Sequence, residues 1–115
     1  DLRVSVTPQS TSSKFLITYQ TKTRQTASGR FTSVRIYKSV AGGSFAGIEH
    51  DIHAFTGFNV SLSDSHMNLI AKVIHAPSTT SALIFTPYVL VNSGDWELGS
   101  RAANHQTNMV VMEYE

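Results

Sequence analysis

The side chains best suited to metal chemistry are concentrated in one short stretch, Glu49-His50-Asp51-Ile52-His53. His50 and His53 stand three residues apart, which would bring both imidazoles to one side of a helical turn, and neutral imidazole binds Zn²⁺ and similar ions. In a trimer, the copies near the axis would bring several such pairs together. The spacing matches none of the established ligand patterns. We therefore favour a polar loop with exposed histidines, and we expect no metal and no cofactor.

Covalent catalysis finds little support in the sequence. The chain has no cysteine, and no serine stands in the G-x-S-x-G pattern of an activated nucleophile. Carboxylate pairs for glycoside hydrolysis can be drawn from Glu49, Asp51, Asp64, Asp95 and Glu97, but any β-protein offers as many. We therefore predict a protein that is not an enzyme.

Trp96 is the best candidate for a platform that faces a sugar. An aromatic face beside hydrogen-bonding groups suits the CH face and the hydroxyls of a saccharide. A single tryptophan is more often a partly buried core or interface residue, and we favour that reading. The candidate contacts to a receptor or glycan are Trp96, Asp95, Arg101, His50 and Asp51.

Length, charge and composition exclude several other classes. A chain of 115 residues makes one domain, residues 1–115, with room for a core without disulfides. The net charge is +1 and no basic run exceeds two neighbouring charges, so we expect no nucleic-acid binding. No apolar run reaches the length of about 20 residues that spans a bilayer, so we expect no membrane insertion. Charged residues make up only 15%, and the hydroxyl-rich surface that this implies is typical of β-proteins that are secreted or sit on particles.

The elements that must position these residues are strands. Apolar residues alternate with period two between turn-forming residues, and no helical period is sustained. We expect eight or so strands, with the main ones at 2–6, 14–21, 31–40, 68–75, 82–91 and 108–115, and short ones at 59–62 and 96–99.

Local features of these segments predict their places in the sheets. Segment 14–21 is apolar on both faces and should be central, and 108–115 should lie inside a sheet for the same reason. Segments 68–75 and 82–91 should pair as antiparallel neighbours joined at Pro77. Pro87 has no N–H to donate, which predicts a bulge or an edge position. Tyr88 and Tyr114 lie on strands, so we expect them in the core or in subunit contacts.

Turns and loops occupy the rest of the chain. Residues 41–44 and 63–66 read as turns, and Phe45–Phe58 reads as a long loop that carries a short strand. Recognition is expected on the loops Thr21–Gly29, Phe45–Phe58 and Gly94–Asn108, because loops carry function on such scaffolds.

Three segments resemble fibre-type domains of tailed, especially marine, bacteriophages. They are LRVSVTPQSTSSKFLI (Leu2–Ile17), APSTTSALIFTPYVLVN (Ala76–Asn92) and MVVME (Met109–Glu113), and together they cover roughly forty residues of the chain. The first two combine a Ser/Thr turn with strands, the third resembles the usual final strand, and their order and spacing carry the resemblance. Ile74-His75-Ala76 stand where such domains commonly have an L-D or Y-D pair. The resemblance implies an antiparallel β-sandwich with a jelly-roll-like topology, for which a TNF/C1q-like fold is one alternative. It also implies a homotrimer that is carried on a virion.

Three functions follow as hypotheses. The first is a non-enzymatic virion module, a phage fibre or spike domain that forms a homotrimer and contacts a host-surface glycan or protein. The second is a carbohydrate-binding module or lectin of cellular origin, with Trp96 in a groove. The third is a capsid decoration or spacer without a ligand. A trimer measured by light scattering favours the first, and a monomer favours the second.

Overall fold

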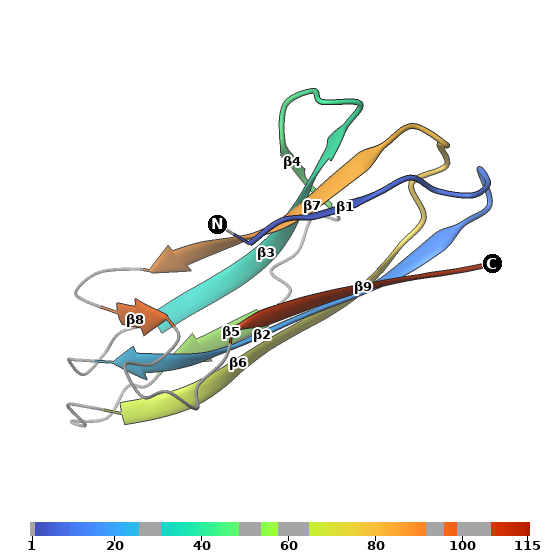
Figure 1. The fold of residues 1–115 in the computed structure, drawn as a ribbon. Coiled ribbons are helices and arrows are strands. Elements are labelled where there is room, and N and C mark those ends of the chain that lie inside the picture. Colours follow the sequence, from blue (N-terminus) through green and yellow to red (C-terminus); the bar gives the residue numbers. More distant parts are fainter. Residues whose placement is uncertain (1, 26–30, 49–53, 58–64, 92–95, 99–106) are drawn as a thin grey trace.

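The computed structural model describes residues 2–25, 31–48, 54–57, 65–91, 96–98 and 107–115 of the chain. In these residues there is no helix, and nine strands form two antiparallel sheets. Figure 1 shows the sheets as two layers, with β3 and β7 in one and β2, β6 and β9 in the other. The prediction of an all-β chain with antiparallel sheets is therefore confirmed.

The first sheet, sheet A, has the order β1-β7-β3-β4, and β5 also pairs with β3. In the second, sheet B, β2 pairs with β6 on one side and with β8 and β9 on the other. The strands of sheet A are β1 (Val4–Val6), β3 (Phe31–Val40), β4 (Ala46–Gly47), β5 (Ala54–Gly57) and β7 (Leu83–Val91). Those of sheet B are β2 (Lys14–Gln25), β6 (Ser65–His75), β8 (Trp96–Leu98) and β9 (Asn108–Tyr114).

The core lies between the two sheets. Successive side chains of a strand point to opposite faces, so every second residue of β2, β3, β6 and β7 turns inward. The rings of Phe15 from sheet B and Phe85 from sheet A lie 5.7 Å apart between the layers. The buried hydrophobic residues are Phe15, Ile17, Tyr19, Val34, Ile36, Ile48, Leu69, Ala71, Leu83 and Phe85.

Strand β2 is the centre of sheet B, as its two apolar faces predict. It is longer than expected, because it runs to Gln25 where a loop from Thr21 was predicted. Thr21 and Thr23 are buried and continue the inward alternation, and β-branched residues favour a pleated strand. Strand β6 starts at Ser65 to pair with this extension, so the predicted turn over 63–66 is wrong at its last two residues.

The predicted pairing of 68–75 with 82–91 is wrong. Strand β6 belongs to sheet B and β7 to sheet A, so residues 76–82 cross from one sheet to the other. Tight hairpins use loops of about two to five residues, and this connection is longer. The chemically similar segment 7–13 also crosses, from β1 to β2. Both proline- and hydroxyl-rich turns therefore close the same end of the sandwich.

Other local predictions have mixed outcomes. Residues 41–44 form the expected turn, in which Ala41 and Gly42 have φ values of 49° and 77° and Gly43 N–H donates to the Val40 carbonyl. The pairing of β7 with β1 ends at Phe85, so Pro87 lies past that pairing, which fits the predicted edge position. The predicted strand at 59–62 falls outside the described residues.

Strand β9 departs from its predicted place inside a sheet. In the described part of the chain it pairs only with β2. Its inward side chains, Met109 and Val111, pack against the core. Its outward side chains Val110 and Met112 are apolar but exposed, so they belong to the outer surface of sheet B.

Candidate functional site

Most of the side chains predicted to contact a ligand lie outside the described residues. These are His50, Asp51, His53, Asp95 and Arg101. Trp96 lies in β8, where its backbone pairs with Gln25, and its side chain is outside the described part. Of the predicted recognition loops, residues 26–29, 49–53, 58, 94–95 and 99–106 also lie outside the described part. Residues 21–25, 46–47, 54–57 and 96–98 of these loops belong to β2, β4, β5 and β8 instead. Among the residues that the structure describes, no group of three or more His, Cys, Asp or Glu side chains could hold a metal ion.

The outward side of sheet B carries a surface that we call the aliphatic face, formed by the outward side chains of β2, β6 and β9. In one row across the sheet, Met112 of β9, Leu16 of β2 and Ile74 of β6 stand in register. In the next row Val110, Thr18 and Lys72 do the same. Four side chains of this face are more than half exposed: Ile70 at 56%, Ile74 at 59%, Val110 at 54% and Met112 at 53%.

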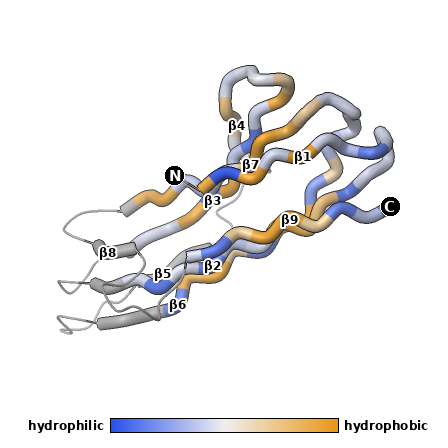
Figure 2. The backbone as a smooth tube through the Cα atoms, viewed as in Figure 1, coloured by the Kyte–Doolittle hydropathy of each residue, from blue (hydrophilic) through white to orange (hydrophobic). Residues whose placement is uncertain are grey.

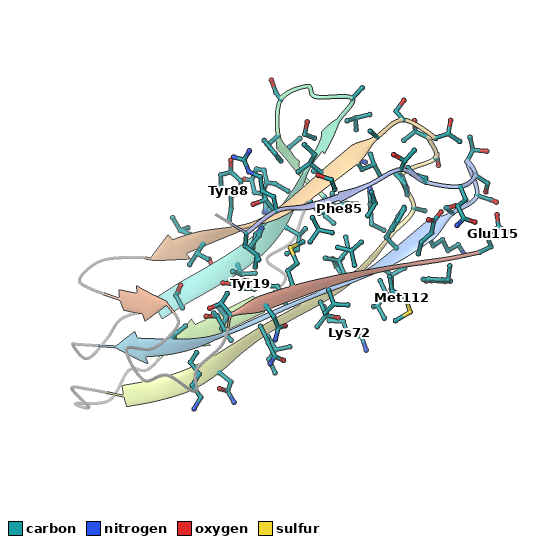
Figure 3. The ribbon with its side chains drawn as sticks, viewed as in Figure 1. Tyr19, Lys72, Phe85, Tyr88, Met112 and Glu115 are labelled. Atoms are coloured by element: carbon teal, nitrogen blue, oxygen red, sulfur yellow. The ribbon has the colours of Figure 1, made fainter. Side chains whose placement is uncertain are left out.

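The figures show how this face is placed. Figure 2 shows hydrophobic residues along much of β9 and along the neighbouring strands of its layer. In Figure 3, Lys72 and Met112 lie on the side of the molecule away from Phe85, which is between the layers. Large apolar side chains that are exposed together on one face mark an interaction site in a soluble protein, so this face is the first candidate site.

The outward side of sheet A carries a second candidate, which we call the tyrosine depression. It is a hollow of about 350 Å³, lined by Ser33, Arg35, Tyr37, Tyr88, Val89 and Leu90. The rings of Tyr37 and Tyr88 stack with their centroids 4.2 Å apart and an angle of 34° between their planes. Tyr88 is 50% exposed, so it is not a core residue, and in Figure 3 it lies on the opposite side from Lys72 and Met112.

A polar contact joins the two sheets inside the sandwich. Lys38 continues the inward alternation of β3, and its Nζ lies 2.8 Å from Nε2 of His75 at the end of β6. The His75 ring is buried and meets the edge of Phe85 at 6.3 Å. A buried polar group needs a partner, and the lysine ammonium, which only donates, implies that Nε2 accepts. The contact links β3 of sheet A to the end of β6 in sheet B, and it therefore serves the structure of the sandwich.

Hydroxyls and carboxylates join the end of β9 to the turn after β1. The Gln9 backbone N–H donates to Glu113 Oε1 at 2.7 Å, and the Ser10 hydroxyl donates to Glu115 Oε1 at 2.8 Å. Hydrogen bonds from the Ser13 side chain and from Gln9 hold the pKa of Glu113 below its usual value. These carboxylates therefore act as structural acceptors.

Tyr19 carries the ionisable hydroxyl of the buried core, as far as the described residues form it. Burial raises the pKa of its phenol, and a hydrogen bond with Thr21 partly opposes that shift. A raised pKa keeps the phenol neutral at physiological pH. Tyr19 thus serves packing rather than proton transfer.

Sequence reasoning anticipated one candidate site in part and missed the other. Two-sided apolarity in 14–21 and 108–115 indicated the aliphatic face, but for 108–115 it was assigned to a place inside the sheet. The alternation put Arg35 and Tyr37 on one face of 31–40, yet their meeting with Tyr88 depends on the pairing of β3 with β7. Only that long-range register could have revealed it.

Comparisons with protein-family models, with curated proteins and with solved structures found no match for this chain. Among the residues with a described structure, no helix has the length and apolar character to cross a membrane. The candidate function therefore rests on the two surfaces and on the sequence.

Proposed function

We propose that this chain is a non-enzymatic structural module of a phage fibre or tail appendage, which assembles as a homotrimer through its aliphatic face and contributes to host-surface attachment. The observation that carries the proposal is the exposure of Ile70, Ile74, Val110 and Met112 on one side of sheet B. The resemblance of the two proline-turn segments and the last strand to fibre domains supports the same assignment.

The occupant of the aliphatic face is a second copy of the chain. Obligate interfaces between identical subunits resemble a domain core cut in half, and the row of Met112, Leu16 and Ile74 has that composition. Lys72 of β6 stands between Ile70 and Ile74 on this face, and its long aliphatic stem can lie along an apolar surface while its ammonium stays in water. Most oligomers of identical chains have closed symmetry, and rings form by head-to-tail contacts; the fibre resemblance implies a ring of three copies with their aliphatic faces toward one axis.

Light scattering after size-exclusion chromatography tests this assembly. The wild-type protein should elute with three times the 12.6 kDa mass of one chain. The double variant Ile74→Lys, Met112→Lys should elute as a monomer, because it places charges in a desolvated contact. The matched control is Leu90→Lys, an equally exposed residue of sheet A, which should remain a trimer. A wild-type monomer at every concentration, or a double variant that still assembles, would refute the proposal.

A further inference from the structure

The tyrosine depression has the shape and chemistry of a small-ligand site. Such sites are concave and mostly apolar, with a few placed polar groups, and enclose about 300–1,000 Å³. The depression holds about 350 Å³ and is lined by two tyrosines, a leucine, a valine, a serine and an arginine. Its position on sheet A leaves it accessible when the aliphatic face of sheet B is covered.

The aromatic wall is fixed by strand pairing. Arg35 stands opposite Tyr88 in the register of β3 and β7, and Tyr37 stands opposite Thr86, so the two tyrosines are diagonal neighbours. Their stacking holds both rings in place, and half of Tyr88 remains exposed. The pair therefore offers a rigid apolar surface and two phenol hydroxyls with little conformational freedom to lose on binding.

The guanidinium of Arg35 is positioned by strand β4. The Arg35 side chain crosses Gly47, where a Cβ would come within 2.8 Å of Cδ and 3.5 Å of Nη1 of the arginine. Only glycine leaves this path open without a shift of the arginine. An arginine fork donates in a plane that fits a carboxylate or a pair of neighbouring hydroxyls.

We infer that the tyrosine depression binds a saccharide that carries a carboxylate, such as a uronic acid residue. The CH face of the sugar ring packs on Tyr88, and the carboxylate accepts hydrogen bonds from Arg35. A hollow of about 350 Å³ with six lining residues suits a sugar ring better than an extended peptide, which needs a groove along several residues. The inference deepens the attachment role proposed above and rests on it for its biological meaning, although the binding itself requires no assembly.

Isothermal titration with glucuronic acid oligosaccharides tests the site, with glucose oligosaccharides of equal length as the neutral comparison. The wild-type protein should bind the acidic sugar more tightly than the neutral one. Tyr88→Ala should weaken binding about tenfold, as expected for a lost aromatic contact. The matched control is Tyr114→Ala, another exposed tyrosine, on sheet B, which should bind as the wild type does.

Arg35→Lys separates charge from geometry. Lysine keeps the charge but lacks the planar fork, so the variant should lose most of the preference for the acidic over the neutral sugar. Titration of the Ile74→Lys, Met112→Lys variant should give the wild-type affinity per chain, which distinguishes a failure of this site from a failure of assembly. Absence of saturable binding, an unchanged affinity in Tyr88→Ala, or tighter binding of a proline-rich peptide would overturn the inference.

Discussion

The two outer faces of this sandwich are formed by the same alternation of side chains, but they differ in what covers those side chains. On sheet A, hydroxyl side chains are buried against other parts of the chain: Ser39 donates to the Gly43 carbonyl and Thr86 to the Leu2 carbonyl. On sheet B, Ile74 and Met112 stand more than half exposed.

This difference teaches what alternation can and cannot say. Period two tells which side of a strand faces the core, and in both sheets it does so correctly. It does not tell what the other side faces, which is the chain itself, water or a partner. In sheet A the chain covers part of that side, and in sheet B no described segment does so. The uncovered apolar side is the one that we assign to sister subunits.

The largest effect on the free energy of unfolding is expected for a substitution between the two sheets, where the core lies. Phe85 is fully buried and contacts the rings of Phe15 and His75. Phe85→Ala should lower the free energy of unfolding by about 3–5 kcal/mol, measured by urea denaturation. Both outer faces should be lost in a single transition. Two separate unfolding transitions in Phe85→Ala, one for each sheet, would contradict this expectation.

Lys38→Met should have the next largest effect. It removes the partner of a buried imidazole nitrogen, which costs about 1–3 kcal/mol, measured in the same way. The control is Lys72→Met on the aliphatic face, where an exposed substitution should change the stability of the monomer by less than about 0.5 kcal/mol and strengthen assembly. Equal losses in the two variants would contradict the assigned difference between an interior and an exterior lysine.

Ile74→Ser and Leu90→Ser compare the two outer faces directly, because these residues are 59% and 64% exposed. At high protein concentration Ile74→Ser should lower the stability per chain by about 1–2 kcal/mol, the value of an apolar side chain that is buried in a contact. The loss should disappear on dilution. Leu90→Ser should stay within about 0.5 kcal/mol at every concentration. If thermal unfolding at several concentrations showed no difference between the variants, the comparison would fail.

Gly47→Ala should change the stability little, but it should clearly change saccharide binding at the tyrosine depression of sheet A. The added methyl group meets the flexible Arg35 side chain rather than backbone, so the change in free energy of unfolding should be within about 1 kcal/mol. The displaced guanidinium should reduce the preference for acidic saccharides, measured by titration. Assembly through sheet B should be unchanged, and a loss of assembly would argue against separate faces.

Glu113 gives the smallest expected effect, and it depends on pH. Its pKa is lower in the folded protein than in the unfolded chain, so its contribution is complete above the unfolded pKa of about 4.3. The contribution is lost as the pH falls through the folded pKa. Glu113→Gln should therefore flatten part of the acid dependence of the unfolding midpoint. Ser13→Ala, which removes the main cause of the shift, should do so as well, and an unchanged acid dependence in both would refute the assignment.

Much of the fold follows from local sequence, and its pairing does not. The strand 31–40 matches β3 at both ends, because apolar alternation and a positive-φ turn mark its end. The turn chemistry of 76–81 was equally clear, but it indicates only that the chain reverses. Whether the next strand joins the same sheet depends on distant partners, since Leu83 pairs with Val6 and Val40.

For the candidate sites, too, local sequence indicated the composition of a segment but not its partners in the fold. The composition of 108–115 showed that both of its faces are apolar, and it could not distinguish a neighbour in the sheet from a neighbour in another subunit. The tyrosine depression could not be predicted, because Arg35, Tyr37 and Tyr88 are ordinary strand residues until their register is known. The local signals were strongest for the histidine cluster and for Trp96, whose side chains fall outside the described residues.

The place of β2 at the centre of sheet B has a consequence for biosynthesis. This strand leaves the ribosome before β6 and β9, its partners over most of its length. Until then both edges of a long apolar strand lack partners, and such segments promote aggregation in nascent chains. Lys14 and Lys22 lie in this strand, and charges of this kind discourage premature pairing between chains. Strand β9 thus completes a sheet whose central strand, β2, is made well before it.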